Sequence, residues 1–251
     1  MSEKTVPLSD HKLVYVWQLP VRIFHWLNVV AIFALCVTGF LIGNPPAIAN
    51  SAEASFSYWF GIVRFIHFIA GFVFFFNFMM RIYWAFVGNK YARWRNYIPL
   101  KKAQWKEIVS VLKVDILHLK NEPLDSIGHN SLALASYFGL FIAFVVQSVT
   151  GFALYAAMSD NWFSSLFAWA SPMAGGDLPT RQVHHLFMWI FIIFTIIHVY
   201  LVFYHDYVER RGITSSMIGG WKFIEKEKTE IETVEDVPYV TLRDKLKKKK
   251  D

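Results

Sequence analysis

The sequence predicts an all-α integral membrane protein built around a bundle of four transmembrane helices. Of its 251 residues, 55% are hydrophobic and 18% aromatic, whereas only 18% are charged. An average soluble domain has about 25% charged residues. The apolar residues lie in four long blocks, and the 25 Lys and Arg residues lie almost wholly between these blocks. This layout is typical of a multi-pass membrane protein.

Each apolar block is long enough to cross roughly 30 Å of hydrocarbon, which takes about 20 helical residues. The first span, about 22–42, contains twenty residues from Ile23 to Ile42 without formal charge. A signal peptide is the alternative for this block, but its apolar run exceeds the usual length of about 7–15 residues. In the second span, about 57–87, Arg64 and Arg81 flank sixteen uncharged residues. The third and fourth spans cover about 129–157 and 181–206.

The positive charges predict the orientation of the spans. Lys and Arg are absent from 43–57 and from 158–180, whereas 88–128 contains eight and the chain after Tyr207 contains eleven. By the positive-inside rule, both termini face the cytoplasm. We therefore expect a cytoplasmic N-terminal segment (1–21), a transmembrane domain (22–207) and a basic cytoplasmic tail (208–251).

The cytoplasmic loop between the second and third spans has apolar residues at helical spacing: Trp105, Ile108, Val109, Leu112, Ile116 and Leu119. This pattern predicts an amphipathic helix that lies flat on the membrane surface. The tail has four consecutive lysines at 247–250 and too few apolar residues to pack alone, so we expect it to be mobile or to touch anionic lipid. The net charge of +6 lies beside the apolar spans, which favours membrane lipid rather than nucleic acid as its partner.

The single cysteine, Cys36, excludes several kinds of metal site. It cannot form an internal disulfide, the cysteine pair that attaches haem covalently, or a four-cysteine iron–sulfur cluster. The sequence also has no glycine-rich phosphate loop. Any metal must therefore be held by other side chains, and the nine histidines are the obvious candidates.

Four histidines lie inside the predicted spans, where ionisable groups are costly and often mark a proton path, an ion path or a cofactor. We place His67 and His184 in the outer half of the membrane, and His25 and His198 in the inner half. Between His184 and His198 the fourth helix rises about 21 Å and turns about 1400°, which is roughly 40° short of four full turns. Both side chains therefore face nearly the same way, and one helix can provide a ligand to each of two stacked sites.

Haem suits this arrangement because its flat, apolar macrocycle fits between helices and two neutral imidazoles can fill both axial positions. A zinc site would need tighter clustering. We predict two haems b, an outer one held by His67 and His184 and an inner one held by His25 and His198. For each histidine alone, a hydrogen bond to a neighbouring helix is the alternative. His185 points about 100° away from His184, which predicts a surface or interface residue that faces an electron donor; a role as a haem ligand is the alternative.

An arginine precedes three of these histidines by three residues: Arg22 before His25, Arg64 before His67, and Arg181 before His184. This spacing places arginine and histidine on one helix face. A guanidinium at the membrane interface could bind a haem propionate through charge-assisted hydrogen bonds. The alternative is that positive residues simply end the spans.

Further motifs accompany the histidines: Val14–Trp17, Pro20–Trp26, Arg64–His67, Arg81–Asn89, Gly128–Asn130, His184–His185 with Met188–Trp189, and Ser215–Met217. Over roughly Val14 to Phe223, the chain resembles the b-type cytochrome subunit of membrane-bound nickel-iron hydrogenases. The axial histidines of that family match His25, His67, His184 and His198. Ser131 departs from the family pattern, because many relatives have proline there.

The resemblance implies a membrane-anchor subunit in the bacterial cytoplasmic (inner) membrane. The large subunit of the hydrogenase would oxidise hydrogen, and its iron–sulfur small subunit would pass electrons to this chain, which has no nickel-iron site of its own. The chain would then reduce quinone as part of a hydrogen:quinone oxidoreductase. Candidate quinone-binding residues are Gly128, His129, Asn130 and His205. The alternative for the first three is that they begin the third helix, with Asn130 as its cap.

Two other functions stay open. A four-span cytochrome b of formate dehydrogenase or thiosulfate reductase would have similar histidine geometry. A haem-free proton or metal-ion transporter could use the membrane histidines as a relay, and it would be colourless.

Overall fold

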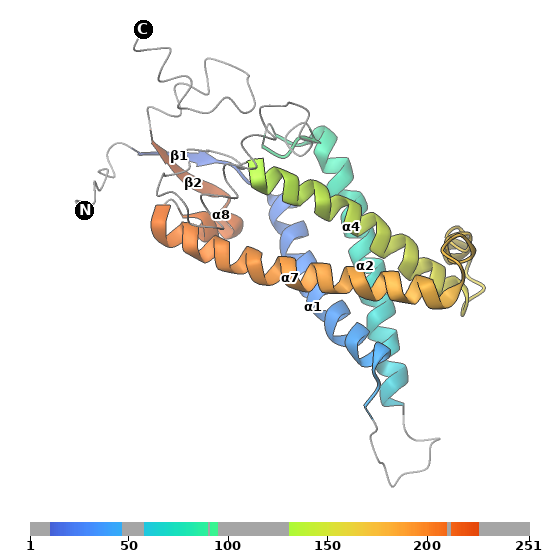
Figure 1. Cartoon of the computed structure of the whole chain (residues 1–251). Helices are drawn as coiled ribbons and strands as arrows, with labels where there is room; N and C mark the ends of the chain where they lie inside the picture. The colour runs from blue at the N-terminus through green and yellow to red at the C-terminus, as the bar shows by residue number, and fades with distance from the viewer. Residues whose placement is uncertain (1–10, 47–57, 90, 95–130, 210–211, 226–251) are drawn as a thin grey trace. The chain divides into compact units, whose positions relative to one another are not determined.

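The computed structural model describes residues 11–46, 58–89, 91–94, 131–209 and 212–225 (Figure 1). Within these residues, four helices are long and apolar enough to cross a membrane, as the sequence predicts. They are α1 (Leu19–Gly43), α2 (Trp59–Val87), α4 (Ser131–Ala156) and α7 (Asp177–Glu209). The predicted surface helix near 105–119 and the tail at 226–251 lie outside the described residues.

The helix ends follow local sequence signals. Pro20 lies in the first turn of α1, where its missing N–H costs no helical hydrogen bond. Two short helices, α5 (Trp162–Ser165) and α6 (Ala170–Met173), connect α4 to α7. The side chain of Asn161 caps α5 by accepting a hydrogen bond of 2.9 Å from the backbone N–H of Phe163. Asp177 occupies the first turn of α7, where the helix dipole favours a carboxylate.

The chain divides into two compact units, and each is described separately. Residues Ile23–Tyr83 and Leu140–Tyr200 form the first, which we call the helical unit. Residues Met1–Arg22, Trp84–Gly139 and Leu201–Asp251 form the second, which we call the sheet unit. The four membrane histidines all belong to the helical unit.

The core of the helical unit takes one buried apolar residue from each long helix: Ala31, Phe74, Ala143 and Phe191. Phe144 stacks on Phe74, with 4.3 Å between ring centroids and 8° between ring planes. Large apolar side chains elsewhere on the helices point outward, and Phe33 is 72% exposed. Helices whose outer surfaces face lipid show this distribution, because lipid tails are as apolar as the side chains.

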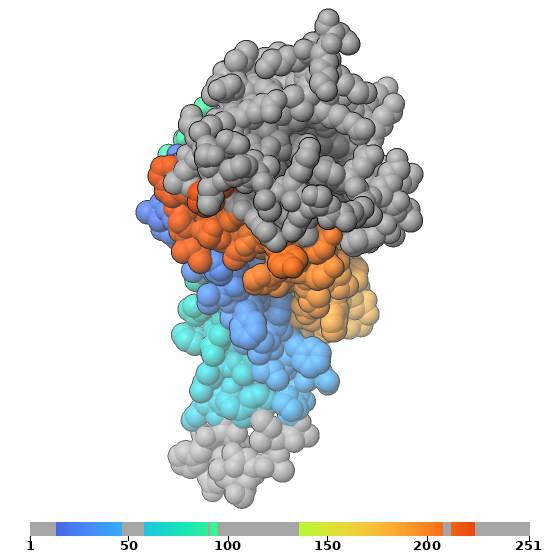
Figure 2. Space-filling model, turned by 90° about the vertical axis from the view of Figure 1, so that its left-hand side faces the viewer, coloured from blue at the N-terminus to red at the C-terminus, as the bar shows by residue number. Residues whose placement is uncertain are grey.

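Helices α1 and α2 lie side by side in two views at right angles to each other (Figures 1 and 2). The buried side chain of Asn77 on α2 joins them. Its amide nitrogen donates to the carbonyl of Phe24 and to the side-chain oxygen of Asn28, both at 2.9 Å. Hydrogen bonds of this kind between membrane helices contribute about 0.6 kcal/mol each.

The sheet unit contains two antiparallel strands, β1 (His11–Tyr15) and β2 (Trp221–Glu225), with His11 opposite Glu225 and Tyr15 opposite Trp221. A short helix, α8 (Ile213–Gly219), precedes β2. The structure is therefore mostly helical, and it adds to the all-α prediction a two-stranded sheet that pairs residues from near the two ends of the chain. The paired strands lie more than 200 residues apart in the chain, so no local pattern identifies their pairing.

Gly220 connects α8 to β2 with a left-handed backbone, at φ +88°. Its N–H donates to the carbonyl of Ser216 at 2.8 Å, and its own carbonyl accepts from the N–H groups of Val16 at 2.9 Å and Trp17 at 3.1 Å. A Cβ atom here would lie 2.5 Å from Cε2 of Tyr15 and 2.7 Å from the carbonyl oxygen of Trp17. The position therefore requires glycine for both its conformation and its space.

Gly220→Ala is expected to destabilise the sheet unit by about 1–3 kcal/mol, because alanine must adopt a left-handed conformation against neighbouring backbone. The rate of protease cleavage within β1 of the detergent-solubilised protein measures this effect and should rise. Gly219→Ala is the matched control, because a Cβ atom at Gly219 would meet nothing within 4 Å. Equal cleavage of the two variants would contradict the prediction.

Candidate cofactor site in the helical unit

The structure brings the four membrane histidines together in two pairs. His67 on α2 faces His184 on α7, with 6.4 Å between ring centroids and 70° between ring planes. His25 on α1 faces His198 on α7, also at 6.4 Å, with 56° between planes. Two imidazoles bonded at about 2.0 Å to opposite sides of one metal ion have centroids roughly 6 Å apart. The spacing of each pair therefore matches two axial ligands of one metal.

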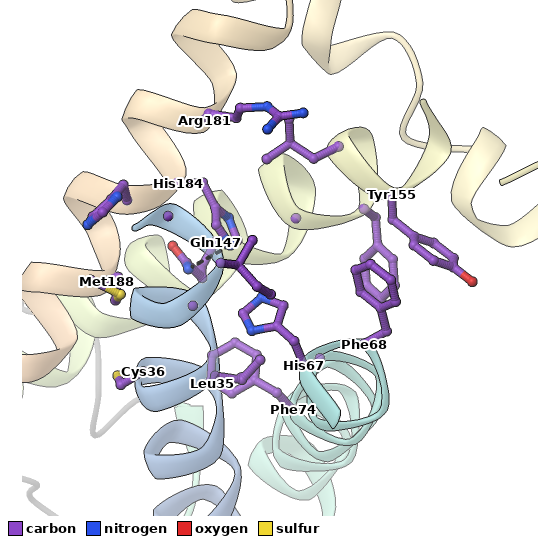
Figure 3. A pocket seen from close by; sticks show the side chains of 18 of the residues that line it. Leu35, Cys36, His67, Phe68, Phe74, Gln147, Tyr155, Arg181, His184 and Met188 are labelled. Carbon is purple, nitrogen blue, oxygen red and sulfur yellow. Dashed lines mark hydrogen bonds between the residues drawn. The ribbon is translucent and has the colours of Figure 1, made fainter. Parts of the chain in front are cut away.

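A cavity of about 760 Å³ adjoins the His67–His184 pair (Figure 3). All four long helices line it, mostly with apolar side chains that include Ile32, Leu35, Phe72, Leu154 and Met188. Phe74 and Phe191 of the core line it as well. Its volume falls in the range of about 300–1,000 Å³ that is typical of small-molecule and cofactor sites.

A pair of histidines suits a metal whose other ligands come from a cofactor rather than from the protein. Among the residues that the structure describes, no group of three or more His, Cys, Asp or Glu side chains could hold a bare metal ion. Haem iron takes its four equatorial ligands from the porphyrin and needs only axial ligands from the protein. The paired imidazoles and the apolar cavity therefore fit haem, and haem ligation by these residues stays a prediction.

Both histidines beside the cavity also contact a threonine on a neighbouring helix. Oγ1 of Thr38 on α1 lies 2.8 Å from Nδ1 of His67. Oγ1 of Thr150 on α4 lies 2.9 Å from Nδ1 of His184. Side chains that hydrogen-bond to the second nitrogen of a metal-binding histidine orient the ring and set its tautomer.

Neither threonine is among the residues predicted from the sequence, although the sequence contains a signal for them. The tetrapeptide Val-Thr-Gly-Phe occurs twice, at 37–40 in α1 and at 149–152 in α4. Aligning the chain with itself would have revealed this repeat. Its functional meaning would still have been hidden, because each threonine contacts a histidine on a different helix.

Two of the three predicted arginines line the cavity. They are Arg64 on α2 and Arg181 on α7, and Figure 3 shows Arg181 beside the cavity. The guanidinium of Arg64 also donates to Sδ of Met158 at 2.9 Å. Arg22 belongs to the sheet unit and donates to the carbonyl of Ile218. Propionate binding by Arg22, Arg64 and Arg181 stays a prediction.

His185 lies beside the cavity, and its predicted role as a surface or interface residue that faces an electron donor stays a prediction. It is half-buried and lines the cavity. A Cβ atom at Gly43 of α1 would lie only 3.2 Å from Cε1 of His185. Because Gly43 has no side chain, α1 approaches α7 closely enough to cover the ring of His185.

The candidate quinone residues are only partly described. His205 is half-buried on α7 within the sheet unit, with its ring centroid 5.5 Å from that of Tyr204. Gly128, His129 and Asn130 lie outside the described residues. The proposed quinone site therefore stays a prediction.

Known proteins resemble most of the chain. Residues 16–220 match the family model described as prokaryotic cytochrome b561. A protein of Azotobacter vinelandii named "Probable Ni/Fe-hydrogenase B-type cytochrome subunit" is 40% identical over 220 residues, which cover 86% of this chain and 90% of that protein.

Two further relatives have similar names. A protein of Bradyrhizobium diazoefficiens with the same name is 42% identical over 214 residues, covering 82% of this chain and 85% of its own length. The "Probable Ni/Fe-hydrogenase 1 B-type cytochrome subunit" of Escherichia coli K12 is 36% identical over 230 residues, covering 88% of this chain and 94% of its own length. The match over most of the length, together with the apolar helices and their paired histidines, shows that this chain belongs to the prokaryotic cytochrome b561 family.

Proposed function

We propose that this chain is the dihaem membrane-anchor subunit of a nickel-iron hydrogenase and that it carries electrons from the iron–sulfur small subunit to membrane quinone. The observation that carries the dihaem proposal is the presence of two histidine pairs, each with centroids 6.4 Å apart, on membrane-spanning helices. The names of the relatives support the hydrogenase as partner. Haem b would supply an iron couple that accepts and releases one electron.

The residues of the chain would hold the cofactors at two depths in the membrane. His67 and His184 are the proposed axial ligands of the outer haem, and His25 and His198 those of the inner haem. Neutral imidazoles add no charge to the apolar interior, so four of them can be accommodated at modest cost. Arg64 and Arg181 line the cavity and would compensate the acidic propionates of the outer haem.

The buried aromatic core would separate the two haem sites. Phe191 lies seven residues from both His184 and His198 on α7, and Phe74 lies seven residues after His67 on α2. Seven residues correspond to about 10 Å along a helix. Phe74 and Phe191 would therefore keep water and ions out of the region between the sites, while electrons cross it.

The proposed orientation has both termini in the cytoplasm, with the hydrogenase on the opposite side of the membrane. The proposed cytoplasmic parts are 1–21 and 208–251, which flank the transmembrane domain at 22–207. Quinone reduction near the inner haem would take up protons from the cytoplasmic side. His205 and Gly128–Asn130 are the proposed quinone-binding residues.

A reduced-minus-oxidised spectrum of the intact purified complex tests this function, with hydrogen as the reductant and haem counted per polypeptide. We expect two haems b per chain, both reduced by hydrogen. A single haem would contradict the dihaem proposal. A colourless protein would instead favour a transporter that uses the histidines as a relay. Co-purification with a molybdenum enzyme would favour a formate dehydrogenase or thiosulfate reductase cytochrome.

A further inference from the structure

We infer that the two Val-Thr-Gly-Phe segments, at 37–40 and 149–152, are matched seats for His67 and His184. In each seat the threonine fixes the histidine tautomer and the glycine leaves space for the imidazole ring. The inference rests on the proposed outer haem and adds four positioning residues to it: Thr38, Gly39, Thr150 and Gly151.

The hydrogen bonds of Thr38 determine the tautomer of His67. Thr38 Oγ1 lies 2.6 Å from the carbonyl oxygen of Ala34, one turn earlier on α1, and donates its single proton there. The same oxygen lies 2.8 Å from Nδ1 of His67, so it must accept a hydrogen bond from the Nδ1–H group. Nε2 of His67 then carries the lone pair that a metal requires.

Thr150 repeats this arrangement on α4. Its Oγ1 donates to the carbonyl of Val146 at 2.7 Å and accepts from Nδ1 of His184 at 2.9 Å. The side-chain amide nitrogen of Gln147 lies 3.2 Å from Nε2 of His184 (Figure 3). An amide nitrogen can only donate, so Nε2 of His184 accepts in this contact, which agrees with the tautomer that Thr150 favours.

The glycine of each seat provides space beside the ring. A Cβ atom at Gly39 would lie 3.3 Å from Cε1 of His67, and a Cβ atom at Gly151 would lie 3.0 Å from Cε1 of His184. Both distances are shorter than ordinary van der Waals contact. Glycine within a helix costs about 1 kcal/mol of stability relative to alanine. At these two positions that cost is offset by the space that glycine leaves for the imidazole rings.

The His25–His198 pair is held differently. Nδ1 of His25 is buried and has no hydrogen-bond partner among the described residues. The ring of His198 stacks on Phe194, with centroids 5.4 Å apart. A hydrogen bond from Nδ1–H makes an imidazole a more basic ligand, which stabilises oxidised iron. The two seats should therefore lower the midpoint potential of the outer haem, relative to the same haem without hydrogen bonds from Nδ1–H of its histidines.

The threonines are tested with Thr38→Val and Thr150→Val in the full chain within the hydrogenase complex, by redox titration and haem counting. Each variant is expected to bind the outer haem about 10–100-fold more weakly and to raise its midpoint potential, with the inner haem unchanged. Thr38→Ser and Thr150→Ser keep the hydroxyl and should restore both properties. Thr195→Val is the matched control, because Thr195 is exposed on α7 and bonds to the Phe191 carbonyl at 2.8 Å.

The glycines are tested by Gly151→Ala, which should displace His184 and reduce outer haem content. Gly139→Ala on the same helix is its control, because Gly139 is exposed and a Cβ atom there would meet nothing within 4 Å. Suppose that the wild type holds two haems. If Thr38→Val and Thr150→Val then have the same haem content and midpoint potentials as Thr195→Val, the inference is overturned but the proposed function is not. A wild type without haem would overturn both the inference and the proposed function.

Discussion

His184→Ala is expected to remove one of the two proposed haems and to abolish quinone reduction by hydrogen. The variant leaves His67 without the ring that lies opposite it at 6.4 Å, so the proposed outer haem would lose one of its two predicted histidine ligands. Electrons that enter at the outer side would then have no route across the membrane. The measurements are haem per polypeptide and the rate of hydrogen-dependent quinone reduction in the purified complex.

Hydrogen oxidation with a soluble artificial acceptor should persist in His184→Ala, because the proposed nickel-iron site belongs to another subunit. His67→Ala should behave in the same way, since it removes the opposite ligand of the same pair. His11→Ala provides a control, because His11 lies in β1 of the sheet unit and should leave both haems and quinone reduction intact. Full haem content in His184→Ala would show that His184 is not an axial ligand.

His198→Ala is expected to remove the other haem and to leave the outer haem reducible by hydrogen. His198 faces His25 at 6.4 Å, and each would lose its partner on replacement of the other. Electrons should therefore reach the outer haem but go no further, and the rate of quinone reduction should fall to background. Stopped-flow spectra with hydrogen as reductant would show one haem that is reduced and stays reduced.

The two sets of variants are expected to block different steps: His184→Ala the entry of electrons at the outer haem, and His198→Ala their transfer onward through the inner haem. His25→Ala should match His198→Ala, whereas neither should resemble His184→Ala in the midpoint potential of the haem that remains. Normal quinone reduction by His198→Ala would exclude a path through both sites. Identical spectra of the haems left in His184→Ala and His198→Ala, at a single potential, would argue for one shared haem.

The sequence was sufficient to predict features that depend on the geometry of a single helix. The four membrane helices follow from the length and apolar composition of the blocks, since the rise per residue links length to membrane thickness. The common face of His184 and His198 follows from the turn per residue of α7. The sequence also placed Arg64 and Arg181 beside their histidines, and both line the cavity.

Contacts between elements needed the tertiary structure. The rotation of α7 predicts that His185 points away from His184, whereas its closeness to Gly43 of α1 depends on how the two helices pack. Thr38 was unnoticed for the same reason, since its partner, His67, is on another helix. The pairing of β1 with β2 joins segments from opposite ends of the chain.

The sequence alone predicts four membrane helices, their apolar character and the positions of the histidines along them. The packing of the folded chain sets which side chains contact those histidines, where the cavity lies and which strands pair. The physical reason is that backbone geometry repeats every 3.6 residues within a helix, whatever its surroundings. The tilt and rotation of one helix against another depend on packing between side chains that are distant in the sequence.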